Sequence, residues 1–200
     1  MRIEDVGIVI GMEDRDVEKT ILEIRQKLML RMNGAASECM VQRGISYRLN
    51  YGVTLPELQQ IASGYRQDSG LANGLWRQEC RECRMLAAML YPASEFFADL
   101  ADVWIDGIQY PDLAEVCCKF LFRLMPGASE AAFRWIASED DMRQYCGFLT
   151  LAHLMRGGRE MKESYVLELE DQAETAMASG RPLVREGASA ALGIIRQRHG

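Results

Sequence analysis

Apolar residues recur every three or four positions along most of the chain, which is the spacing of one face of an α-helix. The first clear example covers residues 14–32, where the periodic positions are Val17, Ile21, Ile24, Leu28 and Met32. We find no convincing alternation of apolar and polar residues, the pattern typical of a strand. The pattern therefore predicts an all-α protein.

Helix-starting and helix-ending residues divide this pattern into ten or eleven helices. Thr54-Leu55-Pro56-Glu57 is a capping box with proline in the first turn, and Pro92 and Gly157-Gly158 end helices. Asn33-Gly34 is expected to close the first helix, Ser129 to begin one, and Ser138 with Asp141 to cap the next. The further helices are expected over 35–44, 55–65, 69–77, 78–91, 95–107, 112–124, 129–137, 140–155, 160–179 and 182–197.

Consecutive helices joined by short turns are typical of solenoids built from helix pairs. The sequence has no strict period, so any repeat is degenerate, as in HEAT or armadillo units. We therefore expect an α-solenoid of HEAT/armadillo-like helix pairs that forms a single domain over 1–200. A compact, irregular helical bundle is the alternative architecture.

Composition narrows the class of protein. The 200 residues are 48% hydrophobic and 26% charged, which excludes a disordered chain, and no apolar run is long enough to span a membrane. The net charge of −6 argues against a surface that binds polyanions everywhere, although a local basic groove stays open. Residues 1–10 do not resemble a signal peptide, and six cysteines without an export signal indicate reduced thiols. We expect a cytoplasmic monomer.

Several segments, in the same order along the chain as in the family, resemble the DNA alkylation repair (AlkD-like) proteins. Residues 51–62 match its "GV-x-x-P-x-L" helix, 71–76 its "LA-x-x-LW" helix and 79–87 its "E-x-R" helix. Residues 104–110 and 184–192 are similar to its "W…I-x-N-W" and "VRKAIGWALR" segments. The resemblance spans about residues 45–196.

The resemblance implies an α-solenoid with a concave, electropositive face that holds duplex DNA. Active members of the family remove N3- or N7-alkylated purines by hydrolysing the N-glycosidic bond, without metal or cofactor. An Asp and flanking aromatic rings stabilise the positive charge that develops on the sugar. We accordingly expect no cofactor and no metal site.

The chain departs from the family at the positions that carry this chemistry. Tyr110 stands where the first pocket Trp is expected, Ala114 where the Asp is expected, and Ala190 where the second Trp is expected. The family's pocket Arg corresponds to Arg143. The catalytic candidates are therefore Tyr110, Asp112, Glu115 and Arg143, and a one-residue slip would bring Glu115 to the acid position. Ala114→Asp with Ala190→Trp is the change expected to restore the pocket.

Basic residues supply the candidates for DNA contact. Arg77, Arg81 and Arg84 lie on one stripe if a single helix runs through Gln78, and such a stripe can follow a phosphate backbone. The alternative is a solvated stripe that pairs with neighbouring glutamates. The resemblance adds Trp104 near the groove, and Arg185 belongs to a second basic set. The expected DNA-binding residues are Arg77, Arg81, Arg84, Trp104 and Arg185.

Three functions remain open at this level. The first is a DNA-binding protein of this family whose glycosylase chemistry is lost or reduced. The second is an active alkylpurine DNA glycosylase with a rearranged pocket that uses Tyr110 with Glu115 or Asp112. The third is a HEAT-type scaffold whose face binds another protein, which the acidic balance favours.

Overall fold

Helices make up all the regular secondary structure of the described residues, 14–158 and 161–199, in the computed structural model. There are eleven α-helices and two 3₁₀ turns in these ranges, together with one isolated parallel bridge between Leu49 and Cys80. The all-α prediction is confirmed. The expectation about the N-terminal segment lies outside the described residues.

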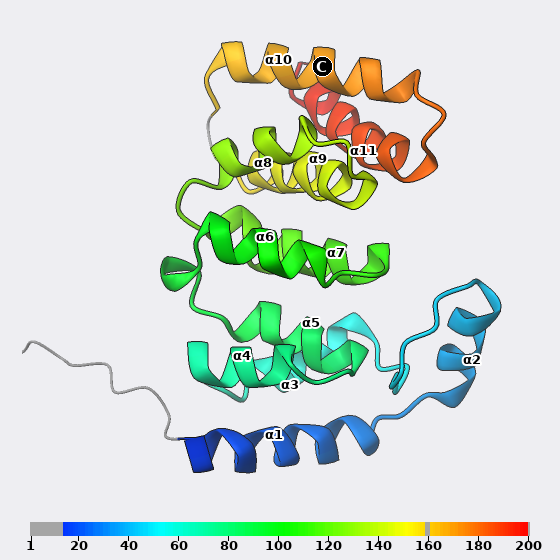
Figure 1. The fold of residues 1–200 in the computed structure, drawn as a ribbon, viewed down its shortest axis with the longest axis vertical. Helices are drawn as coiled ribbons and strands as arrows, with labels where there is room; N and C mark the ends of the chain where they lie inside the picture. The colour runs from blue at the N-terminus through cyan, green and yellow to red at the C-terminus, as the bar shows by residue number, and fades with distance from the viewer. Residues whose placement is uncertain (1–13, 159–160, 200) are drawn as a thin grey trace, which may run out of the picture. The chain divides into compact units, whose positions relative to one another are not determined.

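The chain divides into two compact units at the Tyr91–Pro92 junction. The first contains five helices (Figure 1), which are α1 (Asp14–Met29), α2 (Gly34–Gln42), α3 (Leu55–Ala62), α4 (Ser69–Trp76) and α5 (Arg81–Leu90). Helix α5 packs against α3 and α4, and α4 packs against α1. The approach of α4 to α1 is close, because a Cβ added at Gly74 would lie 2.8 Å from Ile21 Cδ1. The expectation of a single domain over 1–200 stays a prediction.

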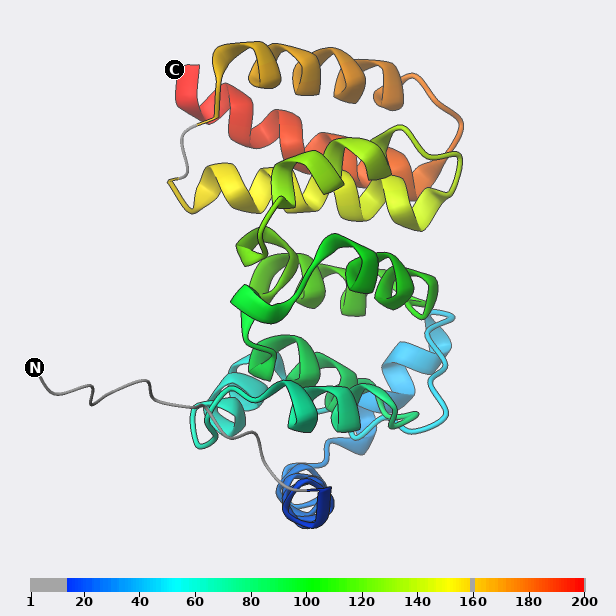
Figure 2. The same cartoon turned by 60° about the vertical axis from the view of Figure 1, so that its left-hand side comes forward.

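The second unit contains two 3₁₀ turns and six helices. These elements are η1 (Ala93–Glu95), α6 (Ala98–Asp106), α7 (Pro111–Phe120), η2 (Phe122–Leu124), α8 (Ala128–Ile136), α9 (Asp141–Arg156), α10 (Glu163–Met177) and α11 (Pro182–His199). Helices α8 and α9 lie side by side, as do α10 and α11 (Figure 2), and α9 also packs against α7 and α11. Successive helices thus form layered pairs, as expected for HEAT-like units.

Aromatic rings form the core between the first helices of the second unit. Phe96 meets Trp104 edge-on with ring centroids 5.0 Å apart, and Phe122 lies 5.8 Å from Phe96 and 5.5 Å from Trp135. All four side chains are buried. This cluster joins η1, η2, α6 and α8 through apolar contact, the main favourable contribution to folding.

Several helix boundaries are confirmed, and three predicted caps are wrong. At the capping box, the Thr54 N–H donates to the Glu57 carboxylate at 3.0 Å. Asn33 does not close α1 but begins α2, since its side chain accepts from the Ala36 N–H at 3.0 Å. Left-handed Gly127, rather than Ser129, precedes α8, and Asp140, rather than Ser138, caps α9 through the Arg143 N–H at 2.8 Å.

The helix break before α5 changes the predicted arginine stripe. Helix α4 ends at Trp76, and the chain is extended at Cys80, where it pairs with Leu49. The Arg81 N–H donates to the Leu49 carbonyl at 3.0 Å, so it is not available to a continuous helix. Arg77 therefore does not share a helix face with Arg81 and Arg84.

None of the described helices is both long enough and apolar enough to cross a bilayer.

Candidate functional site

The predicted pocket residues of α7 lie on different sides of that helix. Tyr110 is the half-buried N-cap residue, and Pro111 begins the helix with a fixed φ. Asp112 lies half-buried in the first turn, and Glu115 lies one turn later on the solvent side. Ala114 has no solvent exposure. Its methyl group belongs to the core, so the residue aligned with the family's acid does not face a pocket.

Carboxylates from α7 and α11 meet beside α9. Loss of hydration raises the pKa of Glu115, and the charges of Glu186 on α11 and Asp112 raise it further. Tyr145 of α9 is buried next to the same two glutamates, which together with burial raise the pKa of its hydroxyl. The approach of the helices is tight, since a Cβ added at Gly187 would lie 3.1 Å from Tyr145 Cδ2. The structure thus brings Asp112 and Glu115 together with Glu186, which the sequence did not single out.

Arg143 is engaged with α6. Its guanidinium donates to Asp102 Oδ1 at 3.2 Å and to Asp106 Oδ1 at 2.5 Å. Asp102 also accepts from Trp135 Nε1 and from Arg134, each at 2.6 Å. Arg143 therefore belongs to an ion-pair network that ties α6, α8 and α9 together.

The predicted basic residues of the first unit differ in their availability. Arg81 is 13% exposed, pairs with Glu82 at 3.0 Å, and donates to the Val53 carbonyl at 3.3 Å. Arg84 Nε donates to the Trp76 and Gln78 carbonyls at 3.2 and 3.3 Å. Arg84 thus holds the α4–α5 turn together and Arg81 ties α5 to the loop before α3, whereas Arg77 is exposed.

The two remaining DNA-binding candidates lie in the second unit. Trp104 is 1% exposed, so its ring is part of the aromatic core and has no free face on which a base could stack. Arg185 is exposed on the first turns of α11, next to Glu186.

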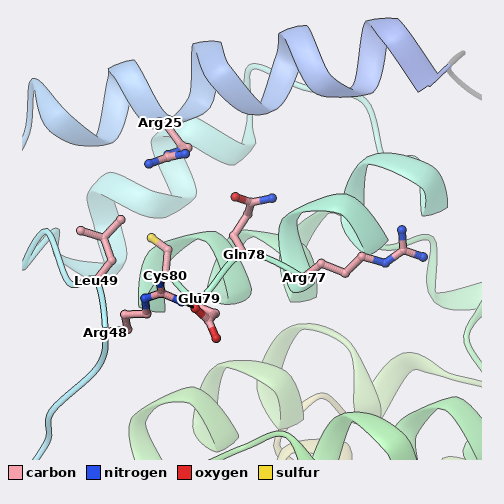
Figure 3. A pocket seen from close by; sticks show the side chains of 7 residues that line it. All are labelled: Arg25, Arg48, Leu49, Arg77, Gln78, Glu79 and Cys80. Carbon is pink, nitrogen blue, oxygen red and sulfur yellow. Dashed lines mark hydrogen bonds and ion pairs between the residues drawn. The ribbon is translucent and has the colours of Figure 1, made fainter.

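A cavity of about 530 Å³ in the first unit is lined by basic residues, two of which were not predicted from the sequence (Figure 3). Its walls come from α1, from the loop between α2 and α3, and from the α4–α5 turn, and consist of Arg25, Arg48, Leu49, Arg77, Gln78, Glu79 and Cys80. Only Arg77 among these was a DNA-binding candidate. Arg25 and Arg48 belong to no local sequence motif. They could not be predicted from the sequence, because only the fold brings them to the same cavity.

The Cys80-Arg81-Glu82-Cys83 segment is buried beside this cavity. The hydrogen bond between the two thiols and the burial of Cys83 raise the pKa of Cys83 far above its ordinary value, which disfavours the reactive thiolate. Within residues 14–158 and 161–199, no three His, Cys, Asp or Glu side chains gather closely enough to hold a metal ion.

Comparison with known proteins agrees with this fold. A family model described as "DNA alkylation repair enzyme" matches residues 24–199. One solved structure, described as "a new family of proteins related to the HEAT-like repeat DNA glycosylases with affinity for branched DNA structures", is similar with a TM-score of 0.79 at 19% sequence identity. The similarity covers 88% of this chain and 74% of the other. No curated protein sequence matches the chain.

Proposed function

The chain belongs to the DNA alkylation repair enzyme family, and on that premise we propose that it binds duplex DNA with its alkylpurine glycosylase activity lost or reduced. The family and the HEAT-like fold support DNA as the partner. The solved relative is described as having affinity for branched DNA, so three- and four-way junctions are proposed as ligands beside the linear duplex.

The burial of Ala114 is the observation that carries the loss of chemistry. A carboxylate that offsets charge on the sugar has to reach the nucleotide in the transition state, and removing such a group costs about 10²-fold or more in rate. The residue aligned with that acid is a methyl group with no exposure. Ala190, aligned with the second Trp, has no ring that could stack on an alkylated base.

The surroundings of the other candidates support the same conclusion. Arg143 is paired with Asp102 and Asp106, so its charge is already offset by carboxylates. Asp112, Glu115 and Glu186 give the neighbouring face of α7 and α11 three carboxylates, which repel phosphate. DNA contact through this face would therefore require basic groups outside the acid cluster, such as Arg185.

The test combines binding and base release on the same DNA. We expect fluorescently labelled duplex and junction DNA to bind at about 50 mM salt and to bind more weakly at about 200 mM, because phosphate contacts release counterions. Alkylated duplex should release little or no 7-methylguanine. Absence of binding to every DNA at low salt would contradict the proposal and favour a protein-binding scaffold.

One observation favours a second candidate, an active glycosylase with a rearranged pocket. Glu115 lies near Tyr145 and Glu186, and burial together with the neighbouring carboxylates raises its pKa, a perturbation that is common among catalytic groups. If base release occurs, Glu115→Gln should abolish it, while Glu130→Gln, an exchange on α8, should leave it unchanged. Release that survives Glu115→Gln would exclude Glu115 as the acid, and Asp112 or a different part of the groove would have to supply the carboxylate.

A further inference from the structure

Three separate segments bring cationic side chains to the cavity of the first unit. Figure 3 shows Arg25 reaching in from α1 and Arg48 from the α2–α3 loop, with Cys80 between them, while Arg77 extends along the other side of the α4–α5 turn. The volume of the cavity, about 530 Å³, lies within the range of small-ligand sites. The cavity is therefore large enough to admit a ligand group rather than a single water.

The wall that carries Arg48 is held in place before any ligand binds. The Leu49 carbonyl accepts from Arg81 N, and the buried Glu82 carboxylate accepts from the Tyr51 and Val53 N–H groups at 3.1 and 3.3 Å. Gly52 has φ +69°, and an added Cβ there would lie 2.2 Å from the Asn33 carbonyl oxygen. A preformed wall reduces the ordering cost of binding.

The charge of the lining is opposite to that of the whole chain. The lining contains three arginines and one glutamate, a net formal charge of +2, whereas the chain carries −6. Arginine forks match phosphate oxygens in two-pronged hydrogen bonds. Cys80, the residue before α5, also lines the cavity, so the positive end of that helix lies at its edge.

A terminal phosphate fits this charge better than an internal phosphate does. A phosphomonoester carries about −1.5 to −2 at pH 7, because its second pKa is about 6. An internal phosphodiester carries one charge and needs an exit for the strand on both sides. Glu79 pairs with Arg48, so it positions that arginine and competes with an incoming phosphate.

We propose that this cavity binds the terminal phosphate of a DNA strand, an inference that rests on the proposed DNA binding. The protein would then recognise strand ends, or the flaps of branched DNA, through the first unit. Arg25 and Arg48 contact the phosphate oxygens, and Arg77 contacts the adjoining nucleotide from the rim.

The test compares DNA molecules that differ only at their ends. Fluorescence anisotropy is measured with one duplex sequence that carries a 5′-phosphate, a 3′-phosphate or hydroxyl ends. We expect a phosphorylated end to bind about tenfold tighter than hydroxyl ends, the effect of about one charge-assisted hydrogen bond. Arg25→Gln with Arg48→Gln should remove this preference and leave binding to hydroxyl-ended DNA within about twofold.

Two single variants sharpen the test. Arg66→Gln replaces an exposed arginine of the same unit outside the cavity, so it should keep the phosphate preference. Glu79→Gln removes the competing carboxylate and should increase the preference. Thermal unfolding checks that every variant is folded. The Arg48 side chain is 79% exposed, so its replacement removes no packing from the core.

The outcomes separate this inference from the proposed function. Equal affinity for phosphorylated and hydroxyl-ended DNA overturns the inference and leaves DNA binding standing. If the double variant weakens binding to a closed circular duplex as much as binding to a phosphorylated end, the cavity takes internal phosphates. This result also overturns the inference. If no DNA binds but inorganic phosphate raises the unfolding temperature of the wild type and not of the Arg25→Gln, Arg48→Gln double variant, both the DNA-end inference and the proposed function fail.

Discussion

Arg143 of α9 donates to the Asp102 carboxylate of α6 at 3.2 Å, and Asp102 in turn accepts from the Trp135 indole at 2.6 Å. One carboxylate thus joins three helices of the second unit. The arginine that aligns with a pocket residue of the resembled enzymes has a structural partner here. Arg143 therefore contributes to the stability of the second unit, and its pairing with Asp102 agrees with the proposed loss of glycosylase activity.

Asp102→Ala should lower the free energy of unfolding by about 1–3 kcal/mol, because the Trp135 N–H and the Arg143 guanidinium lose their acceptor. Urea denaturation followed by fluorescence measures the change. Asp99→Ala, one turn earlier on the exposed side of α6, is the matched control and should cost less than about 1 kcal/mol. Equal losses in the two variants would contradict the role of the network.

Glu82→Gln should destabilise the protein by about 3 kcal/mol, because it leaves Arg81 without its anionic partner and weakens the acceptor of two backbone N–H groups. Glu38→Gln, at an exposed position of α2, should change stability by less than about 0.5 kcal/mol. Hydrogen exchange at the Tyr51 and Val53 amides should accelerate in Glu82→Gln alone. Unchanged exchange would show that Glu82 does not hold this loop.

Gly147→Ala should destabilise by about 1–3 kcal/mol, since the added Cβ would lie 2.6 Å from the Ala132 carbonyl oxygen and 2.7 Å from Ile136 Cγ1. The same exchange at Gly193 of α11 meets no atom within 4 Å. Gly193→Ala should therefore stabilise by about 0.5–1 kcal/mol through helix propensity. Thermal unfolding of both variants tests the close approach of α8 and α9, and shifts of the same sign would argue against it.

Stability should fall as the pH drops from about 6.5 towards 4. Burial, reinforced by the charges of Arg156, Arg123 and Lys119, lowers the pKa of His153 to about 4. In the unfolded chain histidine titrates at about 6.5, so between these two values the unfolded state binds a proton that the folded state does not bind. The loss should stay below about 3 kcal/mol, because the ring is partly exposed and solvent screens its neighbours. Urea midpoints at pH 7 and 5 should differ less in His153→Gln than in the wild type, and equal differences would exclude this cause.

Ala114→Asp should destabilise the protein rather than restore activity. The side chain at this position has no exposure, so a carboxylate there would be buried without a charge partner. This expectation replaces the sequence-based one, in which Ala114→Asp with Ala190→Trp rebuilds the pocket. A lower unfolding temperature and no release of 7-methylguanine are expected, whereas gained release at unchanged stability would contradict the burial argument.

Local signals predicted the helices well because their caps act over a few residues. Pro56, Pro92 and the Thr54–Glu57 pair define their boundaries wherever the rest of the chain lies. The sequence predicted a boundary between helices at 77–78, but not the extended Cys80 that delays the start of α5, because Cys80 pairs with Leu49, more than thirty positions earlier. Helix propensity alone cannot reveal a long-range partner of that kind.

The site was less predictable than the fold, since its residues meet through tertiary packing. Glu186 became relevant only when α11 was seen to lie near Glu115, and Arg25 only when α1 was seen to wall the cavity with Arg48. The resemblance correctly identified the family but could not tell that Ala114 faces the core. Orientation around a helix depends on a register that a one-residue slip changes by about 100°.

The proposed function is tested most directly by a single-turnover reaction on alkylated duplex DNA with protein in excess, in which bound DNA and released 7-methylguanine are recorded together. We expect the DNA to be bound at about 50 mM salt and the alkylated base to stay attached. Base release from the bound DNA at the rate of an active family member would contradict the proposed function, and so would DNA that stays unbound.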